Sequence, residues 1–103
     1  MKAVIDMVKY DTDTAEEVAE AGYGYAGDFE HYSESLYRTK NGSWFLAGSG
    51  GPRSHYSRQT GQNEWSGSSR ITPLSEGQAA EWLEQHREVK ALEEHFSHLI
   101  SEA

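Results

Sequence analysis

The sequence contains no cysteine and only two prolines. The absence of cysteine excludes a disulfide framework, a cysteine-ligated zinc site and a thiol nucleophile. Long apolar runs are also missing: the longest, Trp44–Ala47, has four residues, far fewer than the roughly 18 that a membrane span needs. Asp6 interrupts the first apolar stretch too early for a secretory signal. We therefore expect a cytoplasmic protein that has no membrane partner.

Recognised catalytic and metal-binding patterns are scarce as well. His95 and His98 lie three residues apart beside Glu94, but a zinc site needs three or four ligands and nothing else in the chain clearly supplies them. His86 lies in an apolar stripe near a predicted helix end, where a structural role is favoured. No G-x-S-x-G nucleophile elbow occurs. We therefore expect no catalytic residue, no metal and no cofactor.

One glycine-rich stretch leaves an enzyme open as an alternative. Backbone amides in residues 48–54 could bind a phosphate, with Arg53 as the positive charge. The stretch lacks the lysine of a P-loop, and a dyad of Ser54 and His55 would need a third group and an oxyanion site. A turn that leaves a hairpin explains the same residues, so a small enzyme around this loop is the weaker alternative.

Charge is unevenly distributed along the chain. Nine basic residues against seventeen acidic ones give a formal net charge of −8. Residues 1–37 carry a net −7 and residues 71–103 a net −5, whereas residues 38–70 carry +4. Such an asymmetry bears on partners and association rates rather than on fold. Solvated surfaces are the simpler explanation of the asymmetry, because charged faces keep small domains soluble.

Asn41-Gly42 is the strongest local signal for secondary structure. This dipeptide is typical of the two-residue type I′ turn of a β-hairpin, which would join strands over residues 33–40 and 43–49. The predicted cross-strand pairs are Thr39 with Trp44, Arg38 with Phe45, Tyr37 with Leu46 and Leu36 with Ala47. Both faces then carry apolar side chains, which favours a central hairpin covered on each side.

The flanking segments give weaker signals. Residues 48–69 are typical of a long irregular loop, with a helical turn at 53–58 as one option. Residues 70–74 predict a short strand that its proline confines to a sheet edge. The N-terminus is ambiguous, and a first strand over Ala3–Ile5 and Met7-Val8 is one option. Residues 13–21 fit a helix and an alternating strand about equally, so both remain open.

Ser75 begins the clearest helix. Ser75 and Gln78 match a capping box, and apolar residues follow at helical spacing from Ala79. The stripe continues in a heptad-like pattern to Ile100, too short for an independent coiled coil. It must therefore dock on the domain or on a second copy of the chain. The residues predicted to form a dimer contact are Val89, Leu92, Phe96 and Leu99.

Together these features predict an α+β fold. We expect a small antiparallel β-sheet built on the central hairpin and packed by a C-terminal α-helix. A chain of 103 residues is close to the usual size of one domain. We therefore expect one domain over residues 1–86 and a helical extension, a dimerisation helix, over residues 87–103.

Two surfaces are candidates for binding a partner. Rows of carboxylates imitate a phosphate backbone and fit the basic groove of a nucleic-acid-binding protein. The predicted residues of this acidic face are Asp11, Asp13, Glu16, Glu17, Glu81, Glu84 and Glu88. The basic, aromatic middle of the chain suits single-stranded nucleic acid instead, although the acidic ends oppose a polyanion. The predicted residues of this alternative are Arg38, Arg53, Tyr56, Arg58 and Trp65.

Several sequence blocks occur in a recognisable order. The blocks are Tyr10–Ala15, Ser35–Leu46, Gly50–Pro52 with Ser54 and Tyr56, Pro73–Ser75 and Ala80–Leu83. They resemble a small protein family carried by prophages and other mobile elements, and residues 87–103 depart from it as a longer helical tail. The resemblance supplies no catalytic residues. It implies a context in which small acidic proteins often inhibit host defence, anti-CRISPR proteins among them, by occupying a surface.

These observations lead to an expectation about function. We expect a non-enzymatic interaction protein of a mobile element, an acidic inhibitor whose partner is a host nucleic-acid-handling defence complex. The first alternative is a nucleic-acid-binding module that uses residues 38–70, and the second is the small enzyme described above. A homodimer through the C-terminal stripe is a separate expectation.

Overall fold

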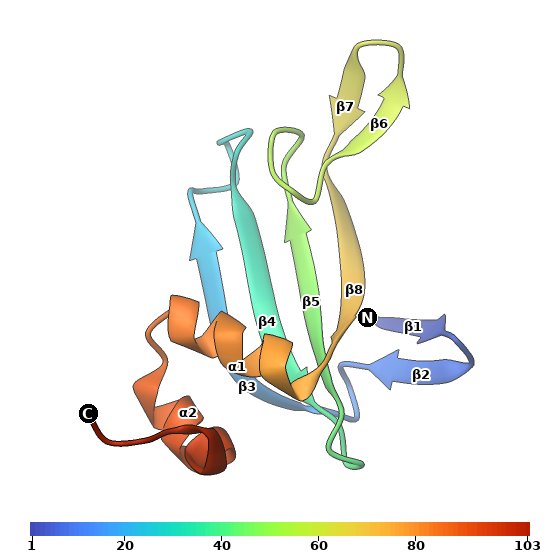
Figure 1. Cartoon of the computed structure of the whole chain (residues 1–103). Helices are drawn as coiled ribbons and strands as arrows, with labels where there is room; N and C mark the ends of the chain where they lie inside the picture. Colours follow the sequence, from blue (N-terminus) through green and yellow to red (C-terminus); the bar gives the residue numbers. More distant parts are fainter.

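The computed structural model describes residues 1–103. Its strands are β1 (Lys2–Ile5), β2 (Val8–Asp11), β3 (Glu16–Tyr23), β4 (Tyr32–Arg38), β5 (Trp44–Gly50), β6 (Arg58–Gly61), β7 (Glu64–Ser66) and β8 (Ser68–Leu74). Its helices are α1 (Glu76–Gln85), α2 (Val89–Phe96) and the short 3₁₀ helix η1 (Ser97–Leu99). Four strands form one antiparallel sheet in the order β3-β4-β5-β8, and β1–β2 and β6–β7 are separate hairpins (Figure 1). With both helices on this sheet, the predicted α+β fold is confirmed.

The central hairpin β4–β5 is confirmed, but its predicted register is wrong by one residue. The observed pairs are Arg38 with Trp44, Tyr37 with Phe45, Leu36 with Leu46 and Ser35 with Ala47. The turn is the cause, because Gly42 N–H donates to the carbonyl of Thr39 at 2.9 Å and Gly42 has a φ of 83°. Asn41 has no positive φ. Three residues therefore form the loop, a type I turn closed by a glycine bulge, instead of a two-residue type I′ turn.

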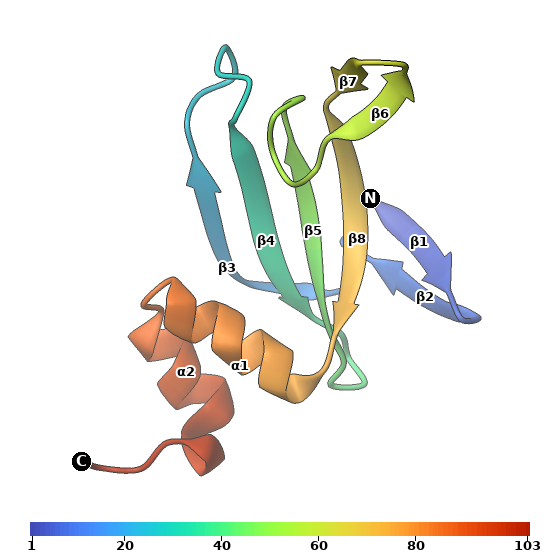
Figure 2. The same cartoon turned by 45° about the horizontal axis from the view of Figure 1, so that its top comes forward.

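The shift in register changes which side chains share a face. A slip of one residue moves the side chains of one strand to the other face relative to its partner. Leu36, Trp44 and Leu46 therefore lie together under the helices, in one apolar cluster. On the opposite face the ring of Phe45 stacks on that of Tyr37, with centroids 5.2 Å apart. The hairpin β1–β2 lies on that second side (Figure 2), where the Tyr10 ring meets the Phe45 ring edge-on.

The N-terminal residues pair as the hairpin β1–β2. Asp6 and Met7 form its two-residue turn and both have positive φ, 53° and 65°. This is the dihedral pattern of the type I′ turn, which the sequence favoured at Asn41-Gly42 instead. Residues 13–21, which fit a helix and a strand equally, lie mainly in β3. This strand forms one edge of the sheet, and its pairing with β4 is irregular near Val18.

Residues 48–69 contain more backbone pairing than the sequence indicated. β5 continues to Gly50, and β6 and β7 form a second hairpin that projects from the sheet (Figure 1). Residues 53–57 form turns and a bend without a helix, and Arg58 begins β6. The predictions of a loop and of a helical turn are therefore wrong, because backbone pairing rather than apolar periodicity organises this segment. The predicted edge strand is confirmed as β8, with Pro73 inside it.

Helix α1 begins as the sequence predicts. The Ser75 hydroxyl accepts a hydrogen bond from Gln78 N–H at 3.1 Å, and the Gln78 side chain accepts one from Ser75 N–H at 2.8 Å. This capping box satisfies amides that the first turn of a helix leaves without partners. It fixes the point at which the chain leaves β8 and crosses the sheet as α1 (Figure 1).

The apolar stripe from Ala79 to Ile100 does not lie on one helix: α1 ends with His86 as its C-cap, close to the helix end predicted there, and α2 begins at Val89. Glu88 N–H donates to the carbonyl of Leu83 at 2.9 Å, and Arg87 N–H donates to that of Glu84 at 3.1 Å. This is the Schellman arrangement that ends a helix. Arg87 adopts the left-handed conformation there, with a φ of 56°, where glycine is usual. The chain therefore turns after α1, and α2 leaves in a new direction (Figure 2).

One apolar cluster joins both helices to the sheet. Its buried residues are Leu36, Trp44, Leu46, Ala79, Trp82, Leu83, Ala91 and Phe96. The Phe96 ring lies 4.9 Å from that of Trp44, and full burial of such a side chain contributes about 1.5–3 kcal/mol. The segment 87–103 thus supplies part of the core, although the sequence favoured an extension. No helix of the structure has the length and apolar composition needed to cross a membrane.

Candidate functional site

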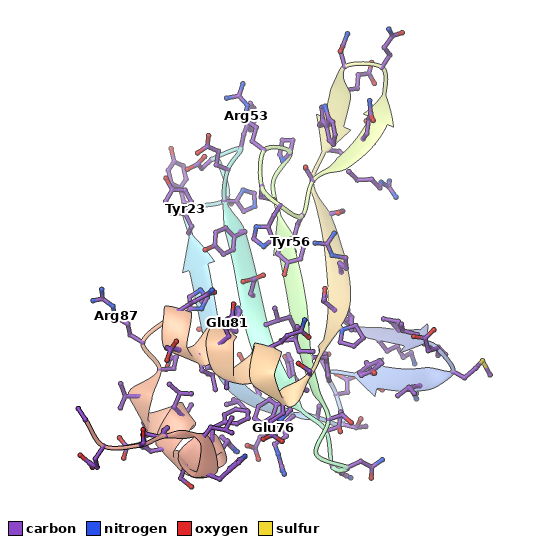
Figure 3. All side chains as sticks on the ribbon, viewed as in Figure 1. Tyr23, Arg53, Tyr56, Glu76, Glu81 and Arg87 are labelled. Atoms are coloured by element: carbon purple, nitrogen blue, oxygen red, sulfur yellow. The ribbon has the colours of Figure 1, made fainter.

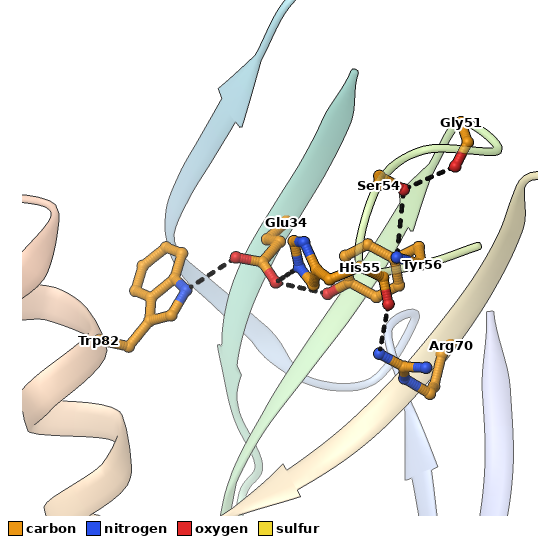
Figure 4. A network of polar contacts seen from close by, with 7 residues as sticks. All are labelled: Glu34, Gly51, Ser54, His55, Tyr56, Arg70 and Trp82. Carbon is orange, nitrogen blue, oxygen red and sulfur yellow. Dashed lines mark hydrogen bonds and ion pairs between the residues drawn. The ribbon is translucent and has the colours of Figure 1, made fainter. Parts of the chain in front are cut away.

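The carboxylate of Glu34, on β4, is a buried polar group at the meeting point of three segments (Figure 4). The residue is only 8% exposed. Tyr56 Oη donates a hydrogen bond to it at 2.6 Å and Trp82 Nε1 donates another at 3.1 Å. The Nε2 atom of His55 lies 3.0 Å from the same carboxylate. One side chain therefore connects the sheet, the turn that follows β5, and helix α1.

A glycine on the neighbouring strand makes room for this network. Gly48 on β5 lies opposite Glu34 in the register of the sheet. A Cβ atom at position 48 would lie 1.9 Å from the Tyr56 hydroxyl oxygen. The absence of a side chain therefore lets the Tyr56 ring cross over β5 and reach the carboxylate.

The turn after β5 holds the two aromatic partners in place. The Ser54 hydroxyl donates to the carbonyl of Gly51 at 2.8 Å and accepts from Tyr56 N–H at 3.1 Å. From β8, the Arg70 guanidinium lies 4.9 Å from the centre of the Tyr56 ring and donates to the His55 carbonyl at 3.3 Å. A cation above an aromatic ring is attracted to its electron-rich face. The turn is thus fixed by the hydrogen bonds of Ser54 within it and by Arg70 on the edge strand β8.

The network also determines the charge states of its members. Burial alone would raise the pKa of Glu34, but the hydrogen bonds from Tyr56, His55 and Trp82 outweigh burial and hold the pKa below its ordinary value of 4.5. Burial, with the hydrogen bond to Glu34, raises the pKa of Tyr56 far above its usual range. At neutral pH the pair is therefore a carboxylate and a neutral phenol. Such a fully bonded acceptor suits structural cross-linking better than proton transfer.

The serine–histidine dyad suggested by the sequence is not assembled. The Ser54 hydroxyl is used inside the turn, and His55 pairs with Glu34 instead. The amides of Gly51, Arg53 and Ser54 all donate to carbonyl groups, so they are not free to hold a phosphate. The anion site that was the weaker alternative for residues 48–54 is therefore not formed by these amides, and the turn favoured there is present. None of the four surface cavities is lined by Glu34 or His55.

Carboxylates from the two acidic ends of the sequence meet in space. Glu16 and Glu17 on β3 line one groove of about 350 Å³ together with Glu88 and Glu94, which come from the start and the body of α2. We call this the β3–α2 groove; Lys90 and His95 also line it, and His95 Nε2 lies 3.8 Å from a Glu16 carboxylate oxygen. Three of the predicted acidic residues are therefore brought together, and Glu94 joins them.

The other predicted acidic residues lie elsewhere. Glu81 lies on α1 (Figure 3). With Glu84 and Leu92 it lines a separate depression against α2. Asp11 and Asp13 lie where the chain leaves β2, and the Asp11 carboxylate accepts a hydrogen bond from Asp13 N–H at 2.9 Å. The prediction of a single acidic face is therefore wrong. Its residues are divided between the β3–α2 groove, the depression beside α1 and the turn after β2.

The predicted basic and aromatic residues do not form one surface. Arg38 ends β4 beside the central hairpin turn, whereas Arg53 lies near the opposite end of the sheet (Figure 3). Tyr56 is 2% exposed, so its ring is not available to stack on a base, and this part of the prediction is wrong. Arg58 and Trp65 are exposed on the hairpin β6–β7.

The predicted dimer residues are divided between the core and the surface. Phe96 is 1% exposed and packs on Trp44, and Leu92 packs against the same cluster. Val89 and Leu99 are 60% and 55% exposed. The break between the helices redirects the stripe into the protein's own core, so Phe96 is a core residue and not a free contact residue.

The histidines of the C-terminal segment pair with separate elements. His98 Nε2 lies 2.6 Å from a carboxylate oxygen of Glu76 on α1, whereas His95 faces β3. No group of three histidine, aspartate or glutamate side chains is placed to hold a metal ion. His86 forms the C-cap of α1, with Nδ1 2.8 Å from the carbonyl of Trp82.

Two groups at these sites escaped the sequence analysis. Glu34 lies two residues before Leu36 and therefore on the same face of β4, so an acid on an apolar strand face was the available signal. Trp82 was assigned to an apolar stripe, without a partner for its indole N–H. Glu94 was considered with His95 and His98 as a metal ligand, and only the tertiary fold shows that it lies beside β3.

Comparisons with protein-family models, with curated proteins and with solved structures found no match to this chain. The resemblance to a family of mobile elements therefore stays a prediction that rests on its sequence blocks. Function has to be inferred from surface geometry and charge, because a fold alone does not specify an activity.

Proposed function

We propose that the protein is a non-enzymatic inhibitor that binds a host nucleic-acid-handling defence complex, in the manner of an anti-CRISPR protein. The observation that carries this proposal is the β3–α2 groove, where four glutamates from opposite ends of the chain gather against a single lysine. Such a surface produces a negative potential that attracts a basic protein groove and raises the rate of association.

The elements that carry these glutamates support the proposal. β3 pairs with β4 from Glu16 to Tyr23 apart from the irregularity at Val18, and α2 is fixed by Ala91 and Phe96 in the core. The carboxylates therefore project from well-anchored backbone, which lowers the entropy lost when a partner binds. Acidic residues on an edge strand also prevent edge-to-edge pairing of sheets. The experiment must separate that structural role from partner binding.

Charge reversal in the β3–α2 groove tests the proposal. The variant is Glu16→Lys with Glu17→Lys, both exposed, and its matched control is Glu30→Lys with Glu64→Lys, which changes the net charge equally at exposed sites away from the groove. Each protein is expressed in cells with active CRISPR immunity against a phage. We expect the wild type and the control to restore plaque formation, and the groove variant to lose that effect.

A second assay measures the competition directly. The purified protein should displace a labelled nucleic acid from the inhibited effector complex, and the groove variant should not. Full inhibition by the groove variant would show that mimicry by these carboxylates is wrong. If the wild type inhibits no such complex but shifts single-stranded DNA at low salt, and Arg53→Ala with Arg58→Ala abolishes the shift, the nucleic-acid-binding alternative replaces the proposal.

A further inference from the structure

A second groove lies between α1, α2 and residues 97–102. Two adjoining cavities of about 550 and 280 Å³ form it, and Glu84, Leu92 and Ile100 line both. We call it the α1–α2 groove. The larger volume falls within the range of about 300–1,000 Å³ that is usual for ligand-binding clefts.

The floor of the α1–α2 groove is apolar and open to solvent. Val89, Leu99 and Ile100 are 60%, 55% and 49% exposed, and they lie in the groove with Leu92 and Ala80. Single exposed apolar side chains are ordinary, but several gathered in one concave place mark an interaction site. Each Å² of this surface that a partner covers contributes roughly 25 cal/mol before the costs of association.

The charged residues of the groove all have the same sign. They are Glu81, Glu84, Glu93 and Glu102, and no lysine, arginine or histidine lines either cavity. This differs from the β3–α2 groove, which includes Lys90 and His95. An acidic rim repels nucleic acid, and an apolar floor offers nothing to a soluble cation. The combination fits a ligand that is apolar on one side and cationic at its flanks.

A helix with apolar residues on one face and lysine or arginine beside them has this chemistry. A second copy of the chain is the competing occupant. In a two-fold dimer the same patch meets itself, so the glutamates of both rims would face one another at a cost in free energy. The charge of the rim therefore favours a basic partner over the homodimer expected from the sequence.

We propose that the α1–α2 groove binds a basic amphipathic helix of the partner protein. The inference rests on the proposed function for the kind of partner, a nucleic-acid-handling protein rich in cationic segments. Apolar side chains of the helix cover Val89 and Ile100, and its cationic side chains face Glu81 and Glu84. The partner is thus held at two places, by charge at the β3–α2 groove and by a helix here.

The probe is a synthetic helical peptide of leucine and lysine with all leucines on one face, labelled with fluorescein and titrated with the full chain. Fluorescence anisotropy should show saturable binding. Val89→Asp with Ile100→Asp, and separately Glu81→Lys with Glu84→Lys, should each weaken it at least about tenfold. All four residues are exposed, and thermal melts confirm folding. Glu30→Lys with Glu64→Lys, both exposed and outside either groove, is the matched control and should change binding less than about twofold.

A peptide of the same composition with its leucines scattered should bind at least about tenfold more weakly. Equal binding of the two peptides, or an equal loss of binding in the Glu30 and Glu64 variant, would overturn the inference by showing attraction through charge alone. A dimer in light scattering that Val89→Asp with Ile100→Asp dissociates would also overturn it. Failure of the proposed function gives a different result. In that case the variant with Glu16 and Glu17 reversed still inhibits, while the peptide still binds the α1–α2 groove.

Discussion

Removing the carboxylate of Glu34 should be among the most destabilising single substitutions in this protein. In Glu34→Ala, the Tyr56 hydroxyl and the Trp82 indole N–H lose their acceptor inside the fold. The His55 side chain is 51% exposed, so it can turn to water at little cost. The loss therefore comes mainly from two buried donors.

The magnitude follows from these two donors. A buried donor left without an acceptor costs about 1–3 kcal/mol, and the variant regains part of that because no carboxylate has to leave water. We expect a net loss of about 3 kcal/mol from a total stability of about 5–15 kcal/mol. For a domain near this size, each kcal/mol lowers Tm by about 4–8 °C. Tm should therefore fall by roughly 12–24 °C.

Urea unfolding followed by circular dichroism measures this loss, with Glu30→Ala as the control at an exposed glutamate. A double-mutant cycle with Tyr56→Phe assigns it to the network. Tyr56→Phe should cost about 1–2 kcal/mol in the wild type and less than about 0.5 kcal/mol once Glu34 is alanine. If the free energy of unfolding of Glu34→Ala lies within about 0.5 kcal/mol of the wild-type value, the two buried donors do not depend on this carboxylate.

Three other predictions concern the same fold. Hydrogen bonding places the folded pKa of Glu34 below its ordinary value of 4.5, so its contribution to stability is complete above that value and is lost as the pH falls through the folded pKa. Urea midpoints measured from pH 7 to 3 should therefore fall less in Glu34→Ala than in the wild type. An equal dependence of the midpoint on pH in both proteins would contradict this. Gly48→Ala places a Cβ 1.9 Å from the Tyr56 hydroxyl, whereas Gly77→Ala in α1 meets nothing closer than 4.0 Å. In thermal melts, Gly48→Ala should lower the free energy of unfolding by at least about 2 kcal/mol, and Gly77→Ala should raise it by up to about 1 kcal/mol. Equal effects of the two substitutions would rule out the packing explanation. Arg87→Gly relieves a φ of 56° and should stabilise the protein by up to about 1 kcal/mol; a lower Tm would show that the arginine side chain matters more than its backbone.

Signals confined to a few neighbouring residues predicted the fold well. The hairpin around Asn41-Gly42, the capping box at Ser75 and the edge strand with Pro73 all depend on local backbone chemistry. The predicted register of this hairpin is wrong because Asn-Gly suits both a type I turn with a glycine bulge and a type I′ turn. A helix end near His86 was predicted, but the change of direction that follows it was not, because Arg87, rather than glycine, occupies the left-handed position.

The candidate sites could be predicted only in part. Charge counting found Glu16, Glu17 and Glu88, yet only the packing of α2 beside β3 shows that they share a groove. The α1–α2 groove exists because the chain turns after α1, which the apolar periodicity did not indicate. Long-range placement of this kind depends on tertiary contacts that no local pattern encodes.

The partners of Glu34 also bear on the order in which the chain folds. They lie 21, 22 and 48 residues further along the sequence, and contacts of such separation form late because closing long loops costs entropy. The hairpin β4–β5 needs only its own turn and can form first, with the carboxylate still hydrated. We infer that water leaves this half of the sheet last, when the turn after β5 and then α1 arrive. The glutamate thereby makes completion of the interior conditional on both segments being in place.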